Sequence, residues 1–396
     1  MGTCRRIITL TAVFLAGTSL LPMRLSAQNV RIGLFDNQVI NTFVFHCTGG
    51  NYQAFGDSAF YRDIKNGELV YISLMDDKLV LMDGDLYFGT FNKLIIKESS
   101  SHCSFRLKLV DPVLEPRNYS GNLEINRFHG SVQLINELSL DKYIAGVVEA
   151  EGGPGATVEF YKAQSILCRS YAIKNWVKHP GQNFNLCDNT HCQSFHGVQD
   201  ENPGIYDAVM ATHSLVLVDQ NYSIVPAIFH SNSGGETQRA ADIWNSGDEY
   251  LQAVVDPFSL GLKEARWKKT ISIREWKQYL SKQCKSDLNK FTDEQLMIRQ
   301  DHRKKYFILG SDSIRLADIR NDLQLRSSFF TMEIQNGSIV LHGKGYGHGV
   351  GMSQEGAMEM ARQGYSYSDI LRFYFYNVQI IELGDVPVSS LPEGFK

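Results

Sequence analysis

The sequence lacks any excess of basic residues, since 39 lysines and arginines are balanced by 43 aspartates and glutamates, giving a net charge of -4. Proteins that bind nucleic acid usually carry a basic patch or stripe, so we expect no nucleic-acid partner. Internal repeats and low-complexity segments are also lacking. Beyond the amino-terminal segment, no stretch approaches the roughly 20 consecutive apolar residues that a membrane-spanning helix needs.

Two common catalytic motifs are missing as well. No Gly-x-Ser-x-Gly pattern occurs, which argues against a serine hydrolase built on a nucleophile elbow. The glycine-dense stretch 343–354 does not end in Gly-Lys-Ser/Thr, so it does not predict a phosphate-binding loop.

The first 27 residues predict a secretory signal peptide. Arg5 and Arg6 precede an almost wholly apolar run over 7–21, and Leu25-Ser26-Ala27 provides small residues for cleavage. The mature protein is then expected to be secreted or periplasmic. The alternative is an uncleaved anchor, which would add a membrane contact.

The remaining chain predicts an α+β fold with mixed β-sheets and several helices. The full chain has 396 residues, 43% of them hydrophobic, which is enough for one large domain or two medium ones. Residues 28–112 are rich in short strand patterns separated by turn residues, as at Asp76-Asp77, and we interpret them as a β-rich scaffold or docking region. A further helix is predicted near 273–284.

Glu151 lies where one predicted helix stops. Apolar residues at helical spacing run from 140 to 148, Ser139 is a plausible N-cap, and Gly152-Gly153-Pro154 ends the helix. A second helix is predicted from Thr157 to about Trp176. A carboxylic acid in a cleft that excludes water can act as a general acid at neutral pH, although a lone glutamate at a helix end is usually only solvated surface.

The segment 187–192 predicts a metal site. Cys187, His191 and Cys192 supply ligands that suit tetrahedral zinc, and His179 or His196 could be the fourth. The alternatives are a disulfide between the two cysteines, which export permits, or free thiols. If zinc binds, two thiolates would lower its Lewis acidity, which favours a structural role.

Two further segments are candidates for substrate contact. Ser231 and Ser233 follow a strand-like stretch within a Ser- and Gly-rich loop that would let a ligand approach the backbone. In the glycine-dense stretch, a tight turn would bring His348, and then Gln354 at a helix start, to a cleft. His348 could equally be a structural group beneath the turn.

Taken in order, these segments resemble the motifs of the stage II sporulation protein D and amidase-enhancer family. The resemblance covers roughly residues 113–383 and is carried by segments 140–151, 162–172, 187–193, 231–237, 250–257 and 345–357. We accordingly expect a family domain over 113–385 and a carboxy-terminal tail over 386–396. One departure is Gly152, where the family usually has methionine.

The resemblance implies a lytic transglycosylase that cleaves peptidoglycan glycan strands, particularly those stripped of stem peptides, between N-acetylmuramic acid and N-acetylglucosamine. It implies Glu151 as the catalytic acid and base, zinc near Cys187, and 1,6-anhydro ends on the product. It also implies that a glycan-binding cleft is lined by Gln164, Arg169 and Tyr171.

Two other functions stay open. A non-catalytic enhancer would bind glycan and stimulate a partner cell-wall amidase. A zinc-dependent amidase would use Cys187, His191 and Cys192.

Overall fold

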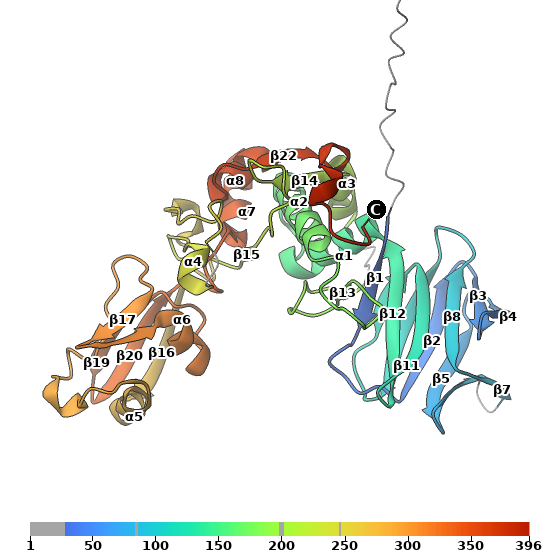
Figure 1. The fold of residues 1–396 in the computed structure, drawn as a ribbon, viewed down its shortest axis with the longest axis horizontal. Helices are drawn as coiled ribbons and strands as arrows, with labels where there is room; N and C mark the ends of the chain where they lie inside the picture. Colours follow the sequence, from blue (N-terminus) through green and yellow to red (C-terminus); the bar gives the residue numbers. More distant parts are fainter. Residues whose placement is uncertain (1–27, 84–85, 198–201, 245–246, 396) are drawn as a thin grey trace, which may run out of the picture.

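The computed structural model describes residues 28–83, 86–197, 202–244 and 247–395. The predicted signal peptide lies outside the described residues. Within them, the predicted α+β class is confirmed: six β-sheets and eight α-helices are present, with a β-rich amino-terminal region (Figure 1). No helix in the described part of the chain is both long and apolar enough to cross a bilayer.

The amino-terminal region is a sandwich of two mainly antiparallel sheets, seen on the right of Figure 1. The seven-stranded sheet has the order β13-β1-β12-β11-β8-β3-β4, and the six-stranded sheet has the order β10-β9-β2-β5-β6-β7. The strands are β1 (Asn29–Leu34), β2 (Thr42–Gly49), β3 (Tyr52–Gly56), β4 (Ala59–Ile64), β5 (Leu69–Met75), β6 (Lys78–Asp83), β7 (Leu86–Phe91), β8 (Lys93–Glu98), β9 (Ser104–Asp111), β10 (Arg117–Ser120), β11 (Asn122–Phe128), β12 (Ser131–Ser139) and β13 (Leu186–Cys187).

Alternating side chains form the sandwich core. Along β9 every second residue from Phe105 to Leu109 is buried, as a strand with one face inward requires. Phe45 of one sheet meets Tyr52 of the other edge to face, with ring centroids 5.3 Å apart. Asp76 and Asp77 both have positive φ, which matches the twist of a tight hairpin between β5 and β6.

Strands on both sides of residue 112 share these sheets. β10 pairs with β9, and β11 pairs with β8 and β12, so the sheets run across the position where the sequence suggested a boundary.

Helices and two short sheets follow the sandwich. The helices are α1 (Leu140–Gly152), α2 (Val158–Lys174), α3 (Pro203–Ala211), α4 (Ala240–Ile243), α7 (Gln354–Arg362) and α8 (Tyr367–Tyr374), and the 3-10 turns are η1 (Pro257–Ser259), η3 (Leu383–Asp385) and η4 (Val388–Ser390). The short sheets pair β14 (Leu215–Val218) with β22 (Gln379–Glu382) and β15 (Phe229–His230) with β21 (Met352–Ser353). One continuous core joins this part to the sandwich; we call the two together the body, residues 28–260 and 346–395.

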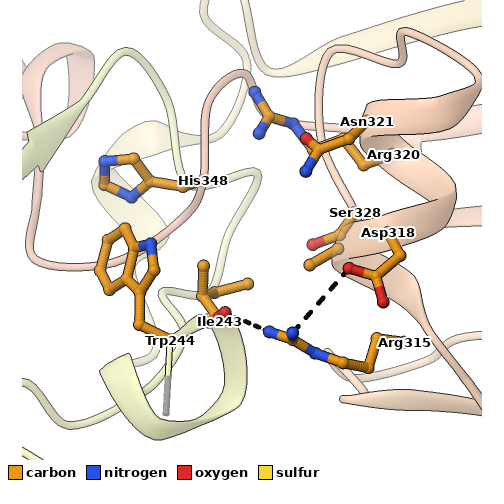
Figure 2. A pocket seen from close by; sticks show the side chains of 9 residues that line it. Ile243, Trp244, Arg315, Asp318, Arg320, Asn321, Ser328 and His348 are labelled. Carbon is orange, nitrogen blue, oxygen red and sulfur yellow. Dashed lines mark hydrogen bonds and ion pairs between the residues drawn. The ribbon is translucent and has the colours of Figure 1, made fainter. Parts of the chain in front are cut away.

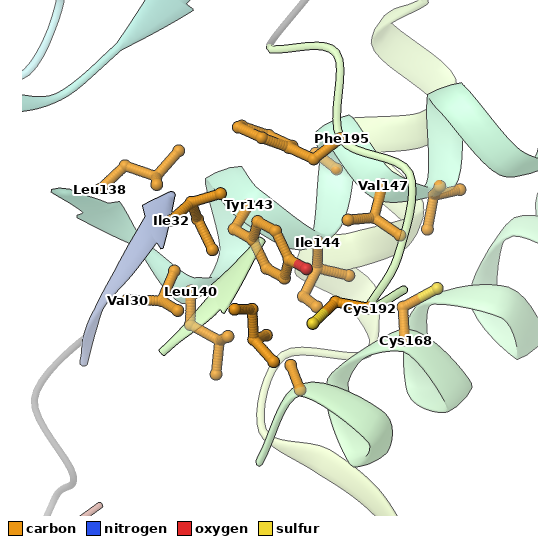
Figure 3. Packing of buried hydrophobic residues seen from close by; sticks show 14 of the residues in the cluster. Val30, Ile32, Leu138, Leu140, Tyr143, Ile144, Val147, Cys168, Cys192 and Phe195 are labelled. Carbon is orange, nitrogen blue, oxygen red and sulfur yellow. The ribbon is translucent and has the colours of Figure 1, made fainter. Parts of the chain in front are cut away.

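The two helices predicted around Glu151 are confirmed. The Ser139 hydroxyl accepts from the Lys142 amide at the start of α1, and α2 begins after Thr157. Figure 3 shows how Tyr143, Ile144 and Val147 of α1 point into the core beside Phe195. Phe395 is also buried, with its ring 4.8 Å from that of Trp176, so the tail packs on the body.

Residues 266–344 form a separate lobe, at the left of Figure 1. Its three-stranded sheet has the order β16-β20-β19, and a second hydrophobic core lies beneath it. The elements are β16 (Arg266–Ser272), α5 (Ile273–Gln283), η2 (Leu288–Lys290), β17 (Tyr306–Leu309), β18 (Asp312–Arg315), α6 (Leu316–Asp322), β19 (Phe330–Gln335) and β20 (Ser338–Lys344). The helix predicted near 273–284 is confirmed as α5.

Candidate functional site

Glu151 is held at the carboxyl end of α1 by two neighbouring segments. Its side chain is partly buried, and Oε1 accepts a hydrogen bond of 2.8 Å from the Ser194 backbone amide. The Gln354 side chain, at the first residue of α7, donates to the Glu151 backbone oxygen at 3.1 Å. The structure therefore brings Glu151 and Gln354 together, and it fixes one carboxylate oxygen by a backbone donor.

The loop after Glu151 is also fixed. The Tyr161 hydroxyl donates to the Gly153 carbonyl at 3.0 Å and accepts from the Ala156 amide at 3.1 Å. A Cβ atom at Gly152 would come 3.0 Å from the Phe160 ring. A larger residue at position 152 would thus require that ring to move, so this loop and helix α2 are fitted to glycine.

Buried polar groups lie beneath Glu151. Gln164 is fully buried on α2, and its amide donates to the Cys168 thiol at 3.5 Å. Burial and the nearby Glu151 charge both raise the pKa of Cys168, so this thiol stays protonated. Gln164 Oε1 and Gln193 Nε2 have no hydrogen-bond partner among the described residues. Buried polar atoms are normally paired, so these two mark space for water or a ligand group.

Four metal-binding side chains come together at His179, Cys187, His191 and Cys192, with all ligand atoms within 4.8 Å of one another. The cluster can hold a metal ion. The distances from Cys192 Sγ to His179 Nε2, from Cys187 Sγ to His191 Nδ1 and from Cys192 Sγ to His191 Nδ1 are 3.3, 3.6 and 3.8 Å. Tetrahedral zinc with bonds of about 2.0 to 2.3 Å places its ligands about 3.3 to 3.8 Å apart, so the donor set fits.

The structure also resolves two alternatives left by the sequence. His179 is the fourth member of the cluster, whereas the charge of Glu151 acts on His196, which lies outside the cluster. Both cluster cysteines are free thiols rather than a disulfide.

Tyr171 lies on the metal-cluster side of α2. Its hydroxyl accepts from Lys178 Nζ at 2.9 Å, and Lys178 also donates to the His191 carbonyl. Burial raises the pKa of Tyr171. Tyr171 thereby ties α2 to the cluster loop.

Arg169 is placed differently from what we expected. Its guanidinium is 1% exposed and bonds to Asp141 at 3.1 Å and to the carbonyls of Thr212 and Leu215 at 2.8 and 3.2 Å. Asp141 is in the first turn of α1 and Glu151 in the last, about 15 Å apart at 1.5 Å per residue. Arg169 therefore joins α1, α2 and the segment after α3, and its guanidinium faces away from Glu151.

Ser231 and Ser233 support the glycine-dense turn. Ser231 accepts from the Glu355 amide through its backbone oxygen at 2.9 Å. The buried Ser233 hydroxyl donates to Asp256 at 2.7 Å, and Asp256 also accepts from Tyr374 at 3.1 Å. Of the two, Ser233 is buried too completely to meet a ligand in this structure.

His348 lines a pocket that does not include Glu151. Its Nδ1 accepts from the Val350 amide at 3.0 Å, and its ring lies 5.1 Å from that of Trp244 (Figure 2). The acceptor role requires a neutral ring; consistently, burial and the nearby Arg320 lower the pKa of His348 to about 4. His348 thus stabilises the turn through Nδ1, and its side chain also lines the pocket.

Sequence patterns offer little indication of the groups that hold Glu151. The Ser194 contribution is a backbone amide, which any residue but proline supplies, so no side-chain pattern indicates it. Tyr161 and Cys168 lie within the predicted helix, where they look like ordinary core residues. Helix α3 is not among the helices predicted from the sequence, although Asn202 and Pro203 are typical of a helix start.

Comparison with known proteins identifies a related family. The family model described as stage II sporulation protein matches residues 128–218, which contain Glu151 and the metal cluster. Stage II sporulation protein D of Bacillus amyloliquefaciens is 29% identical over 286 residues, covering 68% of this chain and 81% of that protein. Its counterpart in Bacillus subtilis is 28% identical over 267 residues, covering 63% and 76%.

A differently named relative is the amidase enhancer of Bacillus subtilis. It is 27% identical over 286 residues, covering 59% of this chain and 39% of that protein. For all three relatives, the similarity extends well beyond the segment matched by the family model. The matched region is thus shared by proteins with a sporulation name and proteins with an amidase-related name.

Proposed function

Because the chain belongs to the stage II sporulation protein D family, we propose that it is an exported cell-wall enzyme, a lytic transglycosylase acting on peptidoglycan glycan strands. The family and its amidase-enhancer relative support a role at the cell wall. Strands stripped of stem peptides are the proposed substrate, and the product carries 1,6-anhydro-N-acetylmuramic acid.

One observation carries the enzymatic proposal. The Glu151 carboxylate is partly buried and is held at Oε1 by the Ser194 amide, above the buried polar pair Gln164 and Gln193. A positioned carboxyl group of this kind can donate and then accept a proton. Hydrolytic glycosidases generally need two carboxylates, but an intramolecular attack by a sugar hydroxyl needs only one.

The proposed reaction moves one proton twice. Glu151 donates its proton to the glycosidic oxygen, and the bond from that oxygen to the anomeric carbon of the muramyl residue breaks. The N-acetylglucosamine part leaves with a free hydroxyl. The Glu151 carboxylate then takes the proton of the muramyl C6 hydroxyl, whose oxygen bonds to the anomeric carbon. The muramyl residue ends as a 1,6-anhydro ring, no water is consumed, and the Glu151 carboxyl group is again protonated.

Zinc is proposed at the four-residue cluster in a structural role. When bound, it would cross-link the loop 187–192 to His179 after α2, and that loop continues directly into Ser194. Catalytic zinc sites keep one coordination position open, whereas four protein donors fill a tetrahedron. This closed set argues against a zinc-dependent amidase.

The test is Glu151→Gln, which keeps the shape of the side chain and removes its acid. We expect the yield of anhydro ends from stripped glycan strands to fall at least about 100-fold, while circular dichroism and glycan binding stay unchanged. Mass spectrometry of the products measures this. Glu149→Gln, two residues earlier on the same helix, is the matched control and should retain cleavage.

The same assay separates the enhancer alternative. If wild-type protein binds stripped strands but forms no anhydro ends, the binding role stands and the enzymatic one is rejected. If anhydro ends persist in Glu151→Gln, this residue is not the acid.

A further inference from the structure

The pocket that contains His348 lies between the body and the lobe and has a volume of about 340 Å³. Figure 2 shows its two walls facing one another. Trp244 and His348 of the body form one wall, and the other comes from β18, α6 and Ser328 of the lobe, including Arg315, Asp318 and Arg320. Neither the proposed acid nor the metal cluster lines it.

The lobe wall carries an arginine, Arg320, that forms no ion pair with a carboxylate of the described residues. Arg315 pairs with Asp318 at 3.9 Å and donates to the Ile243 carbonyl. For Arg320, by contrast, the structure shows one weak bond, from Nε to the Arg326 carbonyl at 3.4 Å, and no ion pair with any described carboxylate. The terminal nitrogens of Arg320 are therefore available. Their positive field reaches across the pocket, since Arg320 contributes to lowering the pKa of both His348 and His230.

The body wall offers an aromatic surface. Trp244 is 38% exposed, and its ring packs edge to face against that of His348. An indole ring presents a large rigid apolar face together with a polar N–H, and a sugar ring has an apolar face of similar size. Asn321, beside Arg320, adds an amide that can bond to sugar hydroxyl or acetamido groups.

We propose that this pocket is a distal subsite that binds one carboxylate-bearing sugar of the glycan strand. Trp244 packs against the sugar ring, and Arg320 binds its carboxylate, as in N-acetylmuramic acid. A volume near 340 Å³ is at the small end for ligand pockets and suits a single ring. The choice of ligand rests on the proposed function.

The subsite is connected to Glu151 through packed residues. The His348 ring lies 5.5 Å from that of His230, and His230 pairs with Ser353 in the β15–β21 sheet. The next residue, Gln354, contacts Glu151.

The experiment measures binding by calorimetry on the full Glu151→Gln chain, so that nothing is cleaved. One probe is a stripped oligosaccharide of alternating N-acetylglucosamine and N-acetylmuramic acid, and the other is an N-acetylglucosamine oligomer of equal length without carboxylates. Adding Arg320→Gln should weaken binding of the first about 10-fold, as expected for losing a charge-assisted bond, and leave the second unchanged. Trp244→Ala should weaken both.

Controls keep the result interpretable. Arg274→Gln removes an exposed arginine of the same lobe and should change nothing. Arg320→Lys keeps the positive charge but loses the planar guanidinium, so its affinity for the muramyl oligosaccharide should lie between those of the Arg320 chain and Arg320→Gln. Near-ultraviolet circular dichroism verifies folding of each variant. The subsite proposal is overturned if Arg320→Gln loses affinity equally for both probes, if it loses none, or if neither probe binds. Because cleavage is not measured, loss of the transglycosylase proposal would leave this outcome unaffected.

Discussion

Arg169 illustrates how the same residue type can serve structure or substrate depending on what surrounds it. A buried guanidinium is costly unless its charge and donors are matched, and here Asp141 supplies the charge while the Thr212 and Leu215 carbonyls accept hydrogen bonds. Burial lowers the pKa of Arg169, and the nearby Asp141 charge opposes this change. Its contribution is therefore to hold three segments together.

We predict that Arg169→Ala lowers the free energy of unfolding by roughly 3 to 5 kcal/mol, because it leaves buried carbonyls without their donor and leaves the partly buried Asp141 carboxylate with His213 as its remaining partner. Urea unfolding followed by circular dichroism measures the change. Arg239→Ala, which breaks an exposed pair with Asp242, should cost no more than about 1 kcal/mol. A stable Arg169→Ala variant that had lost only glycan binding would instead restore this residue to the substrate site.

At the scale of elements, short sequence patterns predicted those helices and strands whose ends and faces are set by neighbouring residues. Ser139, the apolar spacing after it and Gly152-Gly153 fixed α1, and the alternation of apolar residues indicated the strands. The cysteine and histidine spacing indicated the metal cluster. The direction of the Arg169 side chain depends on α3 and the chain after it, and the hold on Glu151 depends on a backbone amide 43 residues later. No periodicity within one segment encodes such long-range contacts.

The cluster loop is the element that couples a metal to the proposed acid. It begins at β13, which pairs with β1 of the sandwich, and it ends at Ser194 against Glu151. Without a metal, the two thiols and two imidazoles contact one another only weakly, and the loop is held by other groups such as Asp188, which pairs with Arg117 at 2.9 Å. Metal binding should therefore fix the Ser194 amide.

We predict about one zinc ion per chain, and we expect Cys192→Ser or extraction with a strong chelator to remove it. Loss of the cross-link should lower the melting temperature and reduce glycan cleavage together, and added zinc should restore both after chelation. Metal analysis and thermal unfolding provide the measurements. Cys284→Ser, in the lobe and outside the cluster, should keep its zinc; unchanged stability of the metal-free protein would show that the loop holds without it.

At the scale of the whole molecule, two hydrophobic cores divide the chain unequally. The body core runs from β1 to Phe395, and the lobe has its own core around Trp276 and Ile319. The sequence predicted a helix near 273–284 but no separate lobe, because the helix and strand patterns of an inserted lobe are of the same kind as those of its host. Contacts between the two parts are largely polar, such as those of Arg303 to the carbonyls of Ser233 and Glu236 at 2.8 and 2.6 Å.

Because the body and the lobe have separate hydrophobic cores, we predict that each can be destabilised without the other. Trp276 is fully buried in the lobe and donates to the Leu296 carbonyl at 2.9 Å. Trp276→Ala should destabilise the lobe by about 3 to 5 kcal/mol and speed amide hydrogen exchange over 266–344, with little change in the body. Phe43→Ala, at an equally buried position in the sandwich, should destabilise the body and speed amide hydrogen exchange there, with little change over 266–344. The lobe carries one wall of the subsite, so Trp276→Ala should also weaken binding of the muramyl oligosaccharide while the Glu151 region keeps its protection. Equal acceleration of exchange throughout the chain would show that body and lobe unfold as one unit.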